Sequence, residues 1–114
     1  MMLASVLFSS TMNRKERIGL PTILVVDDEA HIREWVRLYL EDEGFDIVEK
    51  SNGADALDYA ENHRFDLDIL DIMMPQLDGW ALCTKLRELG DMPILMIEKG
   101  ETNDESKKRI EAAI

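Results

Sequence analysis

Residues 69–79 read ILDIMMPQLDG, a short apolar run that ends on an acid and is broken by a proline. The acid, Asp71, follows Ile69 and Leu70 directly and precedes a second hydrophobic stretch. A carboxylate that leaves water costs free energy unless it is paired or hydrogen-bonded. Asp71 is therefore a candidate for a chemical role, because its position offers no gain in packing.

Apolar runs and helical stripes alternate around this stretch. Residues 23–26 (ILVV) form a continuous apolar run, typical of a strand buried on both faces of a parallel sheet. Between Glu29 and Glu43 the apolar residues recur at helical spacing and form one stripe. The same patterns predict strands at 23–26, 45–48, 67–70 and 93–97 and helices at 29–43, 54–62, 80–89 and 102–114. This order predicts an α/β fold with a doubly wound parallel sheet covered by helices on both faces.

Three acids follow the first and third predicted strands. Asp27 and Asp28 come directly after the first strand, and Asp71 after the third. Ligands of such sheets bind at the carboxyl ends of the strands, so these carboxylates converge if the two strands are neighbours. Converging carboxylates repel one another unless a cation lies among them, and oxygen donors suit Mg²⁺. A carboxylate beside such a cation can attack phosphorus and form an aspartyl phosphate.

Three motifs resemble the receiver domain of bacterial two-component response regulators. They are ILVVDDE at 23–29, ILDIMMP at 69–75 and LDGW at 77–80, and the resemblance covers about residues 21–100. It implies a flavodoxin-like fold with spatial strand order 2-1-3-4-5. The chain stops at Ile114, before the family's fifth strand, last helix and Lys-Pro pair. We therefore expect the order 2-1-3-4, with residues 1–20 as a flexible extension and 21–114 as an incomplete receiver domain.

The resemblance also implies roles for individual residues. Asp71 would be the phospho-acceptor, Asp28 would bind Mg²⁺ directly, and Asp27 would bind it mostly through water. The backbone carbonyl of Met73 would supply a further metal ligand. The family also has a proline and a glycine that shape the loop beneath the site, here Pro75 and Gly79.

Position 98 departs from the family pattern. Receiver domains normally have Thr or Ser after the fourth strand, and its hydroxyl binds the phosphoryl group; here the residue is Glu98. An ionised glutamate can only accept hydrogen bonds. It would add a fourth carboxylate to the site unless Lys99 or the metal compensates it, or it would point to solvent. Both alternatives stay open.

Asp68 is a second departure, because it occupies a strand position where the family has an aliphatic residue. A buried carboxylate without a partner costs several kcal/mol or stays protonated. Either the third strand is exposed at this position, or Asp68 has a partner that the sequence does not identify.

Composition limits the classes of partner. The 114 residues carry a formal charge of −11, which argues against direct binding to nucleic acid or to an anionic membrane. The single cysteine cannot form an internal disulfide, so the cytoplasm is the expected compartment.

Two functions follow from these features. The first is a phosphoacceptor signalling module that receives a phosphoryl group from a histidine kinase or phosphotransfer protein and then alters binding to a downstream protein. It would not be an enzyme beyond assisting its own phosphorylation and dephosphorylation. The alternative is a degenerate or truncated receiver that acts only as a protein-interaction module, because Glu98 and the missing lysine have abolished switching.

The early stop also suggests self-association. Without a fifth strand, residues 94–97 become an apolar sheet edge, which is a template for another strand. The apolar face that the family's last helix covers would be bare. Residues 3–8 are a further apolar run that could dock there, so we expect a homodimer.

Overall fold

The computed structural model describes residues 20–74, 78–98 and 100–114. Strands and helices alternate along the chain, as the sequence patterns predict. Most of residues 1–20, Pro75 and Lys99 lie outside the described residues. The elements are β1 (Thr22–Val26), α2 (Ala30–Asp42), β2 (Asp46–Lys50), α3 (Gly53–Asn62), β3 (Leu67–Asp71), α4 (Gly79–Leu89), β4 (Ile94–Ile97) and α5 (Asn103–Ala113).

The strands form one parallel sheet in the order β2-β1-β3-β4. This confirms the predicted order and the flavodoxin-like fold. Because β1 and β3 are direct neighbours, the chain leaves both strands at the same edge of the sheet. That edge is the carboxyl edge at which Asp27 and Asp71 lie.

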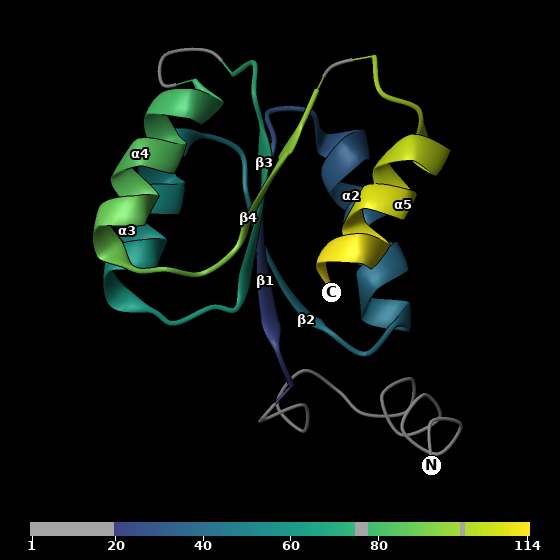
Figure 1. The fold of residues 1–114 in the computed structure, drawn as a ribbon, viewed down its shortest axis with the longest axis horizontal. Helices are drawn as coiled ribbons and strands as arrows, with labels where there is room; N and C mark the ends of the chain where they lie inside the picture. Colours follow the sequence, from purple (N-terminus) through teal and green to yellow (C-terminus); the bar gives the residue numbers. More distant parts are fainter. Residues whose placement is uncertain (1–19, 75–77, 99) are drawn as a thin grey trace.

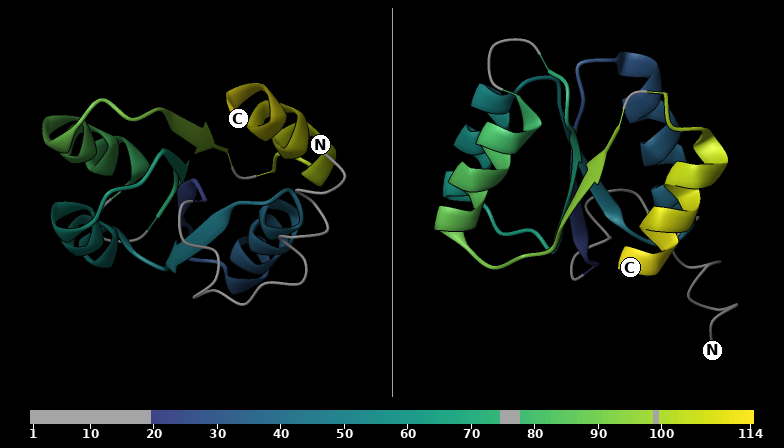
Figure 2. Two further views of the ribbon diagram at one scale, coloured as in Figure 1. Left: turned by 90° about the horizontal axis from the view of Figure 1, so that it is seen from below. Right: turned by 45° about the horizontal axis from the view of Figure 1, so that its top comes forward.

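Two apolar clusters hold the helices on opposite faces of the sheet. Helices α3 and α4 lie on one face and α2 and α5 on the other, as Figures 1 and 2 show. The alternation of side chains along β1 and β3 explains this division, since successive residues point to opposite faces. Leu24, Val26 and Leu70 belong to the α3–α4 cluster, whereas Ile23, Val25 and Ile69 belong to the α2–α5 cluster.

Side-chain caps fix where three of the helices begin. Asn52 accepts a hydrogen bond from the Asp55 N–H at 2.8 Å, and Asp78 accepts one from the Ala81 N–H at 2.8 Å. Helix α5 begins with a reciprocal capping box between Thr102 and Glu105. None of the helices in the described ranges is long and apolar enough to cross a membrane.

Helix α5 covers the sheet face that we expected to be bare, so that expectation was wrong. Ile110 is fully buried in the cluster that also contains Val36 and Ile97. The Tyr39 hydroxyl donates to Glu111 at 2.9 Å, and the Lys107 ammonium lies 4.9 Å from the centre of the Tyr39 ring. The helix that follows β4 therefore docks beside α2 (Figure 1).

Candidate functional site

Three carboxylates meet at the carboxyl edge of the sheet. Asp27 and Asp28 follow β1, and Asp71 is the last residue of β3. One oxygen from each of the three side chains lies within 4.8 Å of the others. Asp27 and Asp71 are buried, with 7% and 3% of their surface exposed. The structure thus brings together the three acids that the sequence singled out.

Asp27 is held on several sides. Its Oδ1 accepts a hydrogen bond from the Glu29 N–H at 2.9 Å, and its own N–H donates to the Lys50 carbonyl at 3.1 Å. The Arg33 guanidinium donates to the Asp27 carbonyl at 2.7 Å. Both the backbone and the side chain of Asp27 therefore have a fixed orientation towards the cluster.

Arg33 and Arg37 of α2 connect the surroundings of Asp27 to β2. Both guanidinium groups contact Glu49 on β2, with Nε to carboxylate distances of 3.4 Å for Arg33 and 2.9 Å for Arg37. The sequence analysis did not identify this pair. The available signal was two arginines four residues apart, on one face of a helix that follows the acids.

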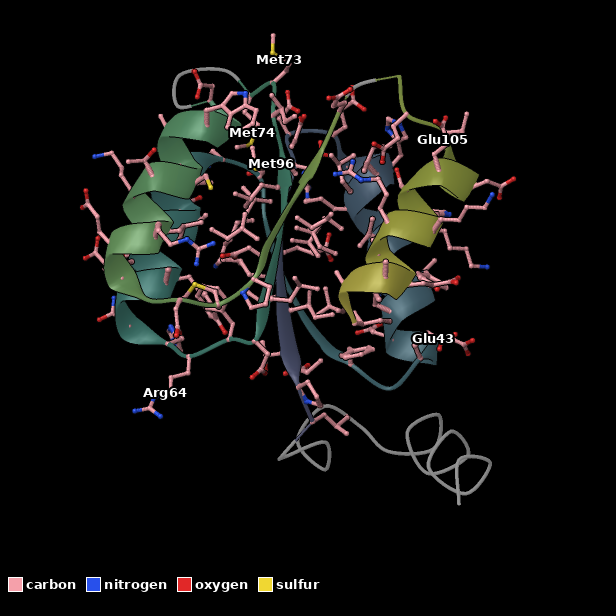
Figure 3. All side chains as sticks on the ribbon, viewed as in Figure 1. Glu43, Arg64, Met73, Met74, Met96 and Glu105 are labelled. Carbon is pink, nitrogen blue, oxygen red and sulfur yellow. The ribbon has the colours of Figure 1, made fainter. Side chains whose placement is uncertain are left out.

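Asp71 is oriented by the loop that follows it. Its Oδ1 accepts a hydrogen bond from the Met73 N–H at 3.0 Å. The Ile72 N–H donates to the Ile97 carbonyl at 3.1 Å, which ties the start of the loop to β4. The Met73 side chain is 62% exposed and projects outward at this edge (Figure 3). The role of the Met73 carbonyl as a metal ligand stays a prediction.

Gly79 closes the same loop at a point with no room for a side chain. Its N–H donates to the Ile72 carbonyl at 2.9 Å. A Cβ at this position would lie 2.7 Å from Ile72 Cα and closer still to the Asp71 carbonyl oxygen. Only glycine allows the first turn of α4 to approach the end of β3 so closely. Pro75, the other residue expected to shape this loop, lies outside the described residues.

A cavity of about 120 Å³ opens beside Asp71 on the α2–α5 face. Glu98 is exposed and also lines this cavity. The two alternatives given for Glu98 therefore both hold in part, because its side chain reaches solvent and its carboxylate also lies next to the acid cluster. Lys99 lies outside the described residues. The other residues that line the cavity are Asp27, Glu29, Ile32, Trp35, Ile97, Gly100, Glu101, Asn103 and Ser106.

Glu101 fixes the loop between β4 and α5, a feature that the sequence analysis missed. Its carboxylate accepts a hydrogen bond from the Ser106 hydroxyl at 2.6 Å and forms an ion pair with Arg109 at 2.6 Å. The Glu101 side chain is only 10% exposed. The partners lie five and eight residues further on, a spacing that carries no recognised sequence signal.

Asp68 fits neither of the two alternatives fully, because it is buried and the charge of Arg87 acts on it without a hydrogen bond. It lies in β3 with no exposed surface, so the strand is not open to solvent there. Neither of its oxygens has a hydrogen-bond partner in the part of the chain that the structure describes. Burial raises the pKa of Asp68 from 3.8 to about 8, while the charge of Arg87 acts in the opposite direction. The carboxyl is therefore mostly protonated at neutral pH, which is how a core strand tolerates it.

Comparisons with known proteins agree with this geometry. Residues 23–114 match the response regulator receiver domain family, and the chain belongs to that family. The transcriptional regulatory protein SrrA of Staphylococcus aureus is 46% identical over 80 residues, which are 69% of this chain and 33% of SrrA. The chain thus spans about a third of the length of this relative.

Solved structures give the same result for the fold. The chemotaxis protein CheY4 of Vibrio cholerae superposes with a TM-score of 0.69 at 33% identity, covering 83% of this chain and 81% of CheY4. A response regulator receiver protein of Sinorhizobium medicae has a TM-score of 0.72 at 25% identity, covering 84% of this chain and 95% of its own. The chain is a receiver domain of the two-component type, which is a signalling module.

Proposed function

We propose that this receiver domain accepts a phosphoryl group on Asp71 from a histidine kinase or phosphotransfer protein, with Mg²⁺ as cofactor. The observation that carries the proposal is the cluster of Asp27, Asp28 and Asp71 at the carboxyl edge of two neighbouring strands. The cluster supports this function because burying a carboxylate at a strand end costs free energy, and a chemical role explains why such an acid is kept there.

The donor set fits Mg²⁺. Three carboxylates within 4.8 Å of one another supply hard oxygen ligands, and a divalent cation relieves their mutual repulsion. Asp28, Asp71 and the Met73 carbonyl would bind the ion directly, and Asp27 mostly through water. The bound ion would neutralise negative charge on the attacking carboxylate and on the phosphoryl oxygens.

In the proposed reaction, an oxygen of the Asp71 carboxylate forms a bond to the phosphorus of a phosphohistidine. The phosphorus–nitrogen bond breaks, and the imidazole leaves with the electron pair and takes up a proton. The Met73 N–H holds Asp71 Oδ1 and so fixes the direction of attack. Glu98 opposes the reaction, because its carboxylate shares the cavity in which the phosphoryl dianion would lie.

We further propose that the modified carboxyl edge changes binding to a downstream protein in the cytoplasm. SrrA is described as a transcriptional regulatory protein, which suggests a regulator of transcription as one context for such a domain. The charge of −11 argues that this domain itself does not contact DNA.

Incubation with a small phosphodonor and Mg²⁺ tests the proposal. Intact mass should show one added phosphoryl group that is labile to base and absent in Asp71→Asn. Labelling should be slow, since the site lacks a hydroxyl at position 98, and Glu98→Thr should accelerate it about tenfold or more. Asp58→Asn, which changes an exposed acid on α3, is the control and should label normally. Absence of labelling in both the natural sequence and Glu98→Thr would instead favour the protein-interaction module.

A further inference from the structure

Asp68 lies where the sheet meets the α3–α4 layer. It pairs in register with Leu24 on β1 and Ile94 on β4, both of which belong to or pack against the apolar cluster of that face. It has no exposed surface, and the described residues offer neither carboxyl oxygen a hydrogen bond. The acceptor function of Asp71 makes no use of this group.

The charged group that acts on Asp68 comes from the end of α4. Arg87 donates hydrogen bonds to the Met92 carbonyl at 2.7 Å and to the Gly90 carbonyl at 3.5 Å. The Asp68 N–H donates to the Pro93 carbonyl at 3.0 Å. Arg87 and the Asp68 backbone thus bind consecutive carbonyls of the α4–β4 connection, which places the guanidinium next to the strand that carries the buried acid.

Other titratable groups on this face have different partners. Tyr59 of α3 is stacked on His63 at a centroid distance of 4.3 Å, and Lys50 of β2 lies 5.5 Å from the centre of the Tyr59 ring. Cys83 of α4 packs against the apolar cluster as a partly buried thiol. Leu24 and Val26 of β1 and Ile94 and Met96 of β4 contribute apolar side chains to this face. Within the described ranges, Arg87 is the charge that influences Asp68.

We propose that Asp68 and Arg87 form a proton-controlled latch between β3 and the α4–β4 connection. When Asp68 is protonated, the guanidinium of Arg87 holds the Met92 and Gly90 carbonyls. When the carboxyl gives its proton to solvent, the guanidinium turns to the new carboxylate and releases those carbonyls. The connection between α4 and β4 therefore loosens as the pH rises, whether or not Asp71 carries a phosphoryl group.

The sign of the pH dependence follows from the pKa of Asp68, which burial raises from 3.8 to about 8. The contribution of this group to stability is complete below the unfolded pKa and is lost as the pH rises through the folded pKa. Between the unfolded pKa of 3.8 and the folded pKa of about 8, the unfolding equilibrium constant should rise about tenfold per pH unit. Because the window includes neutral pH, small changes in cellular pH would alter the population of the loosened form.

A double-mutant cycle with Asp68→Asn and Arg87→Met tests the latch. Urea unfolding at about pH 5 should give additive effects, because a neutral Asp68 has no ion pair with Arg87. At about pH 9 the two changes should be coupled by about tenfold or more in the unfolding constant. Asp91→Asn and Arg64→Met, which change an exposed acid in the same connection and an arginine that points away from the body (Figure 3), are the matched controls.

Two further measurements test the latch, and the first of them needs no variant. The carboxyl carbon of Asp68 in the natural sequence should titrate near pH 8 in an NMR experiment, and a midpoint near 3.8 would overturn the latch. Amide hydrogen exchange of Gly90, Asp91 and Met92 should be faster in the natural sequence than in Asp68→Asn at about pH 9, and equal at about pH 5. Coupling of the same size at both pH values, or equal exchange at both, would also overturn it.

Discussion

At the scale of single residues, Gly79 sets how closely α4 approaches the end of β3. Gly79→Ala would force a Cβ against the backbone of Ile72 and Asp71, so we expect a loss of about 1–3 kcal/mol in the free energy of unfolding. Phosphoryl labelling of Asp71 should fall as well. Gly90→Ala is the control, because its Cβ would meet only the flexible end of Met92 at 3.0 Å. Urea unfolding of both variants tests this, and equal losses would contradict it.

Trp35 should report on metal binding, because it lines the same cavity as Asp27 and Asp71. We expect added Mg²⁺ to change the tryptophan fluorescence in the natural sequence and in Trp80→Phe, but not in Trp35→Phe. Asp28→Asn should abolish the change, since it removes one of the three proposed ligand carboxylates. A full response in Asp28→Asn would remove the basis of the metal assignment, and Asp58→Asn controls for the loss of one surface charge.

The acid cluster could be predicted residue by residue because the acids lie at the ends of two apolar runs, and neighbouring parallel strands end at one edge. The anchoring of Glu101 by Ser106 and Arg109 could not, since it depends on where α5 begins and how it is rotated. Asp68 was recognised as anomalous from the sequence. Its surroundings were not predictable, because the depth of a strand position depends on the packing of both helical layers.

At the scale of elements, Ile110 is the buried apolar side chain through which α5 packs on the sheet. Ile110 is fully buried against the sheet, whereas Ile114 is 48% exposed. Ile110→Ala should therefore cost about 2–4 kcal/mol in the free energy of unfolding, and Ile114→Ala should cost much less. Urea unfolding compares the two, and similar losses would show that α5 does not dock through Ile110.

The start of α5 was readable from the sequence, because Thr102 followed three residues later by Glu105 is a capping pattern. The face on which it docks was not. Its position depends on contacts that are distant in the sequence, such as the burial of Ile110 and the hydrogen bond between Tyr39 and Glu111, which are 72 residues apart. Local patterns define where helices and strands begin and end, while contacts at this separation decide which face a terminal helix covers.

At the scale of the whole molecule, β4 is an edge of the described sheet, and self-association through it remains a prediction. The cover provided by α5 removes one of the two surfaces on which that prediction was based. Light scattering of the full chain should show a dimer that strengthens with salt, because a charge of −11 opposes self-association at low ionic strength. A chain that starts at Met12 should be more monomeric. Stable monomers in both chains at high salt would contradict the prediction.

The strand order β2-β1-β3-β4 places β1 and β3 inside the sheet, with a hydrogen-bonded neighbour on each side. The edge strands can fray one at a time, but the interior pair separates only when most of the fold opens. Asp27 and Asp71 extend from that interior pair. The cluster of Asp27, Asp28 and Asp71 therefore belongs to the most slowly opening part of the domain, and its geometry should persist through openings of β4 and α5 that expose new surface to a partner.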